Sequence, residues 1–94
     1  MENDSTTPVS ANSVTAAASA LLSSLATINA SIQAITLIPR SGKTICWALG
    51  GAASSSTPAV PPGGISLTIT KAVADTIYVY SADGGPNLDV IQHV

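Results

Sequence analysis

The stretch ANSVTAAASALLSSLATINASIQAITLI, residues 11–38, decides the predicted fold, and it contains no Asp, Glu, Lys or Arg. Its apolar residues recur at alternating steps of four and three, which is the a/d pattern of a heptad repeat. A straight helix of this length would be about 42 Å long, and its apolar stripe would need a partner. The pattern therefore predicts a coiled-coil helix over residues 11–38.

The residues on this seam favour an assembly of three or more chains. Leu25 at an a position and Ile28 at a d position, with Leu22 widening the seam, disfavour a two-stranded coil. The e and g positions carry no charge that could select a different partner chain. We predict a homotrimer through a parallel coil; a core helix of a monomer is the alternative. The residues expected to mediate oligomerisation are Val14, Ala18, Leu21, Leu25, Ile28, Ile32 and Ile35.

After Pro39, which is expected to end the helix, the period changes to two. Apolar residues alternate with smaller or polar ones, and Gly and Pro pairs punctuate the runs. The expected strands are 45–49, 65–69, 77–80 and a short last run at 88–94.

These segments divide the chain into three parts. Residues 1–10 are expected to form a flexible N-terminal arm, because they are polar and lack periodicity. Residues 11–38 are the coiled-coil helix. Residues 39–94 are expected to form a small β module with a Ser/Pro/Gly-rich loop at 52–64. The predicted fold class is therefore α+β, a long trimeric helix followed by a small antiparallel β module shared between subunits.

Composition narrows the classes of function. Only 9% of the 94 residues are charged, against about 25% in ordinary globular chains. The formal charge is −2 and the only basic residues are Arg40, Lys43 and Lys71, which argues against nucleic acid as a partner. The single cysteine, Cys46, excludes an intramolecular disulfide, and we expect it to be a small buried hydrophobe.

A membrane span is an alternative interpretation of residues 16–38. This uncharged segment is long enough to cross a bilayer. However, Ser, Thr, Asn and Gln are scattered through it, so apolarity is confined to a stripe. We expect no membrane as a partner, with a single-span small membrane protein as the alternative.

The motifs that could carry chemistry are weak. Ser41-Gly42-Lys43-Thr44 ends like a phosphate-binding loop, but Leu37 stands where that loop requires Gly. His93, the only histidine, lies next to the last residue, so no nucleophile and rigid base can be assembled. We therefore expect no enzyme and no cofactor.

Two further features give surface or turn hypotheses. Asp83 and Asp89 bracket a Gly-rich turn and could hold calcium, although turn-forming Asp is commoner, so no metal is expected. Tyr78 and Tyr80 could form a surface for a partner or a glycan, whereas Trp47 is expected in the core.

An uncharged, Ala/Ser/Thr-rich coil, SVTAAASALLSSLATINASIQAI, followed by a Gly- and Pro-punctuated β module, resembles small phage virion proteins. Head-fibre, capsid-decoration and short tail-fibre proteins have this plan. The resemblance implies a trimeric, non-enzymatic virion component, assembled in the host cytoplasm, that docks on the capsid or tail. It assigns no functional residue. A glycan-binding adhesin module is the remaining alternative.

Overall fold

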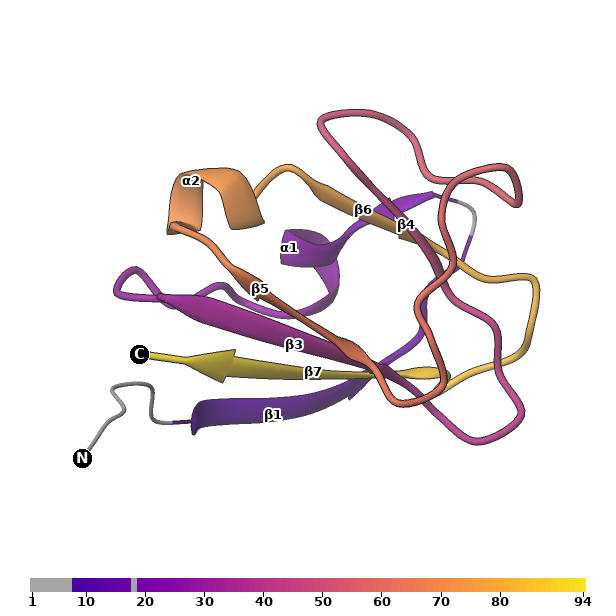
Figure 1. Ribbon diagram of the computed structural model, residues 1–94, viewed down its shortest axis with the longest axis horizontal. Helices are drawn as coiled ribbons and strands as arrows, with labels where there is room; N and C mark the ends of the chain where they lie inside the picture. The colour runs from indigo at the N-terminus through magenta and orange to yellow at the C-terminus, as the bar shows by residue number, and fades with distance from the viewer. Residues whose placement is uncertain (1–7, 18) are drawn as a thin grey trace.

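The computed structural model describes residues 8–17 and 19–94, which form two antiparallel β-sheets and two short helices. The larger sheet has the order β1-β7-β3-β5, with strands β1 (Pro8–Val14), β3 (Ala34–Pro39), β5 (Ile65–Thr68) and β7 (Leu88–His93). The smaller sheet has the order β2-β6-β4, with strands β2 (Ala20–Leu21), β4 (Cys46–Leu49) and β6 (Ile77–Tyr80). The helices are α1 (Leu22–Leu25) and α2 (Lys71–Ala74). Figure 1 shows the two sheets and places α2 at the same end of the molecule as the C-terminus.

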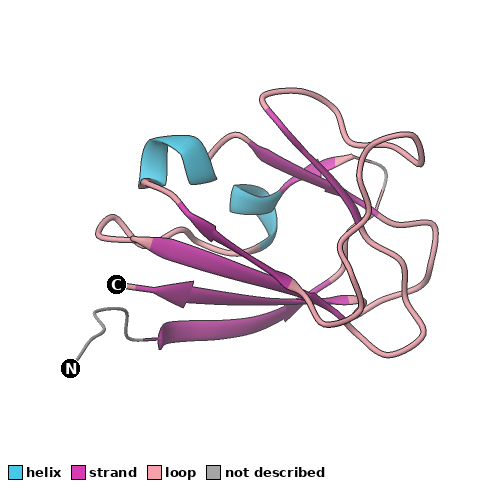
Figure 2. Ribbon diagram, viewed as in Figure 1, coloured by secondary structure: helices cyan, strands magenta, loops and turns pink. Residues whose placement is uncertain are grey.

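The prediction of a coiled-coil helix at 11–38 is wrong, because among the described residues of that range only Leu22–Leu25 is helical. The described remainder consists of loops and of the strand residues that form β2, most of β3 and the end of β1 (Figure 2). The segment is rich in Ser, Thr, Asn and Ile, which lose conformational freedom or compete with helical hydrogen bonds. A helix of this composition does not repay its nucleation cost unless its apolar stripe is buried.

The end of the 11–38 segment has the period of two that is typical of a strand, in addition to the heptad pattern. Ile35, Leu37 and Pro39 are buried on one face of β3, whereas the residues between them are half-buried on the other. Pro39 therefore belongs to the end of a strand instead of stopping a helix.

The strands expected in the C-terminal half are confirmed as β4, β5, β6 and β7. They do not form a module of their own, however. β3 pairs antiparallel with both β5 and β7, so the segment expected to be a helix completes their sheet. The β module predicted to be shared between subunits is therefore replaced by sheets that pair within one chain.

The hydrophobic core contains residues from both halves of the chain, so neither half has a core of its own. Four residues of the predicted seam, Val14, Ile28, Ile32 and Ile35, are buried in it. Leu21 and Leu25 are half-buried, and Ala18 lies outside the described residues. The core's largest buried members besides these are Leu22, Leu37, Ile45, Ile77, Val79, Leu88 and Val90.

Two buried amides hold the irregular N-terminal segments in place. The Asn87 side chain accepts a hydrogen bond from the Ala16 N–H at 2.8 Å and donates one to the Ala16 carbonyl at 2.9 Å. Gln92 accepts from the Asn29 N–H and donates to the Thr27 carbonyl, each at 2.7 Å. These amides supply the backbone partners that a buried non-helical segment requires.

No named strand or helix lies in residues 52–64, and the second half of this segment is tied to β4. Ala59 forms a bridge with Cys46, and the Val60 N–H donates to the Ile45 carbonyl at 2.7 Å. Of the predicted arm, residues 8–10 belong to β1, whereas residues 1–7 lie outside the described residues.

Candidate functional site

The outer face of the smaller sheet carries both tyrosines that the sequence singled out. On β6, Tyr78 and Tyr80 are half-buried on one face, whereas Ile77 and Val79 are buried on the other. Tyr80 is opposite Cys46 of β4. The tyrosines therefore form a row on one surface, and their role in binding stays a prediction.

A hollow of about 290 Å³ lies beside Tyr80. Its lining residues are Thr44, Cys46, Ser55, Tyr80, Ala82 and Asp83. The Asp83 Oδ2 accepts a hydrogen bond from the Thr44 N–H at 2.7 Å, which fixes the carboxylate at this site. The structure thus brings Thr44 and Ser55 beside Tyr80 and Asp83, which the sequence pattern did not indicate, because Thr44 and Ser55 come from distant segments.

Asp89, the other carboxylate considered for calcium, has different partners. Its Oδ1 accepts hydrogen bonds from the Ser13 hydroxyl at 2.7 Å and from Arg40 at 3.0 Å. The Ser13 hydrogen bond, opposed by partial desolvation and supported by Arg40, holds the pKa of Asp89 below its ordinary value. Within the described part of the chain, no three His, Cys, Asp or Glu side chains are grouped to hold a metal ion.

The edge of the larger sheet forms a second candidate surface. β5 is an edge strand that pairs only with β3 among the described strands. Ile65 and Leu67 are half-buried against the core, whereas Ser66 and Thr68 are exposed. Residues 64–70 contain no charged side chain. Natural edge strands are commonly protected by charge, proline or a covering element. Residues 65–68 contain neither a charge nor a proline, and no second described strand pairs with β5.

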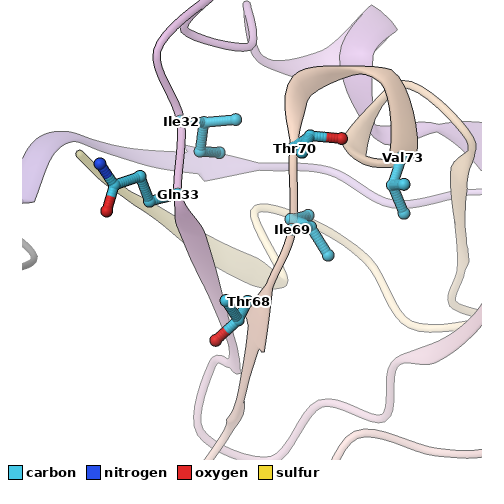
Figure 3. A pocket seen from close by; sticks show the side chains of 6 residues that line it. All are labelled: Ile32, Gln33, Thr68, Ile69, Thr70 and Val73. Atoms are coloured by element: carbon cyan, nitrogen blue, oxygen red, sulfur yellow. The ribbon is translucent and has the colours of Figure 1, made fainter.

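An open hollow of about 480 Å³ continues from the end of β5 toward α2 (Figure 3). Its apolar wall is formed by Ile32, Ile69 and Val73, and Val73 is 40% exposed. The polar lining residues are Gln33, Thr68 and Thr70. Sequence reasoning missed this hollow because it placed Ile32 and Gln33 in a coil and the other four lining residues in a separate module.

The Ser41–Thr44 segment forms a turn between β3 and β4, so it has neither the helix nor the phosphate-binding geometry of the motif it resembles. The Lys43 N–H donates to the Arg40 carbonyl at 2.9 Å, and Gly42 has a φ of 76°. A positive φ at the third position of a hydrogen-bonded turn favours glycine.

His93 takes part in a polar row on the outer face of the larger sheet instead of being solvated alone. Its Nε2 lies 3.1 Å from the Thr36 hydroxyl, which is 2.8 Å from the Ser66 hydroxyl. Among the described side chains, no carboxylate hydrogen-bonds this imidazole. The row therefore lacks the third group that orients the base in a catalytic triad.

Cys46 is a buried free thiol and Trp47 packs, partly buried, against the core, as expected. No helix among residues 8–17 and 19–94 has both the length and the apolarity to cross a membrane.

The chain matches no known protein family. No curated protein and no solved structure matches it either.

Proposed function

We propose that this protein is a non-enzymatic structural component of a phage particle that associates with further copies of itself through the β5 edge. The assignment to a phage particle is motivated by the uncharged, Ala/Ser/Thr-rich sequence that resembles small virion proteins. The coil that was the other half of this resemblance is not part of the fold of the described residues. The observation that supports self-association is the uncharged outer edge of β5, with which no further described strand pairs.

A strand edge associates by extending its sheet, because unpaired backbone N–H and C=O groups can bond to another strand. A second copy is the favoured occupant, since an uncharged edge meets no like-charge repulsion from its own counterpart. Lys71 lies just beyond β5, outside the segment that would pair. The apolar hollow at Ile69 and Val73 continues this edge and adds surface for burial.

The trimer predicted from the sequence requires a different interface, because the described residues form no coiled-coil helix. Two β5 strands pairing with each other would form a dimer. A β5 strand pairing with β1 of a neighbour, the opposite edge of the same sheet, could close a ring of three.

The particle role is tested by purifying phage particles on a density gradient and measuring their protein content by mass spectrometry. We expect this chain in a fixed ratio to the major capsid protein after washing with high salt. Recovery only in the soluble fraction of the infected host would contradict the proposal.

A further inference from the structure

The hollow beside Tyr80 is not needed for the proposed association, because it lies on the smaller sheet, whereas β5 belongs to the larger. Cys46 is buried and Tyr80 half-buried, whereas Thr44, Ser55, Ala82 and Asp83 are exposed. Tyr80 and Cys46 therefore form the floor, and the exposed residues form the rim.

The size and composition of the hollow suit a small ligand. Its volume of about 290 Å³ is near the lower limit, about 300 Å³, of ligand pockets in proteins. Such pockets combine an apolar lining with a few fixed polar groups. Here Tyr80, Cys46 and Ala82 are the apolar part, and Asp83 is fixed by its hydrogen bond from the Thr44 N–H.

The polar groups of the rim can both donate and accept hydrogen bonds. Asp83 accepts only, whereas the hydroxyls of Ser55 and Thr44 do both. Among the described residues, the Asp83 Oδ1 forms no hydrogen bond, so that oxygen is available to a ligand hydroxyl. A ligand rich in hydroxyls uses such a mixed set fully, whereas a cation uses only the acceptors.

The aromatic surface extends beyond the hollow. Tyr78 lies two residues from Tyr80 on the same face of β6, roughly 6.6 Å along the strand. Its cross-strand neighbours are Ala48 on β4, a side chain too small to cover a ring, and Leu21 on β2, which adds apolar surface beside it. Two rings in line offer an extended apolar platform for the C–H faces of a chain of sugar rings.

We propose that the Tyr80–Asp83 hollow binds a neutral saccharide. The Tyr80 ring stacks against the C–H face of one sugar, Asp83 accepts from its hydroxyls, and Tyr78 contacts the next unit. The negative charge of Asp83 and the net charge of −2 disfavour sialylated or sulfated glycans.

The test is a glycan array, followed by NMR titration of the ¹⁵N-labelled full chain with methyl β-D-glucopyranoside, methyl β-D-galactopyranoside, maltose and lactose. We expect binding to at least one neutral saccharide, with shifts at the Thr44, Tyr80 and Asp83 amides. A blank array and unchanged spectra, or binding only to anionic glycans or to choline, would overturn the proposal.

Variants locate the site. Tyr80→Phe keeps the ring and should keep binding, whereas Tyr80→Ala should lose it. Asp83→Asn should raise the Kd about tenfold, equivalent to about 1.4 kcal/mol, while the control Asp75→Asn on the distant α2 side should leave the Kd unchanged. If Tyr80→Ala is unfolded by NMR, the Asp83→Asn result decides alone: an unchanged Kd refutes the site. None of these outcomes bears on association through β5.

Discussion

At the scale of single residues, one cluster of surface hydrogen bonds contributes to the stability of the larger sheet. The Ser13 hydroxyl, Arg40 and Asp89 form one exposed polar group in which both donors reach the same carboxylate oxygen. These side chains tie β1 and the end of β3 to β7. Because Asp89 is 37% exposed, solvent and salt weaken the contribution of this group.

Asp89 gives a prediction about pH. A carboxyl whose folded pKa is lowered stabilises the fold above its unfolded pKa of about 3.9, and this contribution is lost as pH falls through the folded pKa. Chemical denaturation should therefore show that the stability advantage of the wild type over Asp89→Asn shrinks below about pH 4. Ser13→Ala should raise the pKa of Asp89 in a carboxyl NMR titration. An Asp89 pKa at the ordinary value in the wild type would contradict this account.

At the scale of elements, the sequence predicted the four strands after Pro39 but not those before it. In the C-terminal half, Ile77 and Val79 alternate with Tyr78 and Tyr80, and turns bound each run, so period two is unambiguous. Residues 11–38 contain both periods, which overlap at Ile35: Ile28, Ile32 and Ile35 satisfy the heptad, while Ile35 and Leu37 satisfy the strand. The pairing of β3 with β5 and β7 favours the strand over the helix, and the local sequence does not indicate that pairing.

Like the strands, the candidate sites were predictable only where they depend on local sequence and not on contacts between distant segments. Tyr78 and Tyr80 share one strand, so their common face followed from its period. The meeting of Tyr80 with Ser55 depends on how the 52–64 loop folds back on β4, which its low-complexity sequence does not specify. The buried amides Asn87 and Gln92 were missed for the same reason, since their partners are backbone groups of distant segments.

A substitution at Ile28 has different expected effects in the observed fold and in the predicted coiled coil. It is 5% exposed within a single chain, so Ile28→Asp should bury a charge without a partner and cost more than about 4 kcal/mol. Thermal unfolding followed by circular dichroism should show loss of the cooperative transition, whereas the exposed neighbour variant Thr27→Asp should unfold nearly as the wild type does. A folded Ile28→Asp monomer released from an oligomer would instead indicate a subunit seam.

At the scale of the whole molecule, the β4 edge of the smaller sheet and the β5 edge of the larger sheet differ in whether another segment pairs with them. The loop at 58–60 pairs along β4 and covers it, whereas β5 has no partner on its outer side among the described strands. A chain with few charges and an open, uncharged edge is suited to meet copies of itself.

Native mass spectrometry of the full chain tests this central claim most directly. Thr68→Lys adds a charge at an exposed position of β5, and Ala52→Lys adds the same charge at an exposed position of the loop. We predict a dimer or trimer for the wild type and for Ala52→Lys, and a folded monomer for Thr68→Lys, because a lysine on an edge strand opposes pairing. A wild-type monomer, or an oligomer that Thr68→Lys leaves intact, would contradict association through β5.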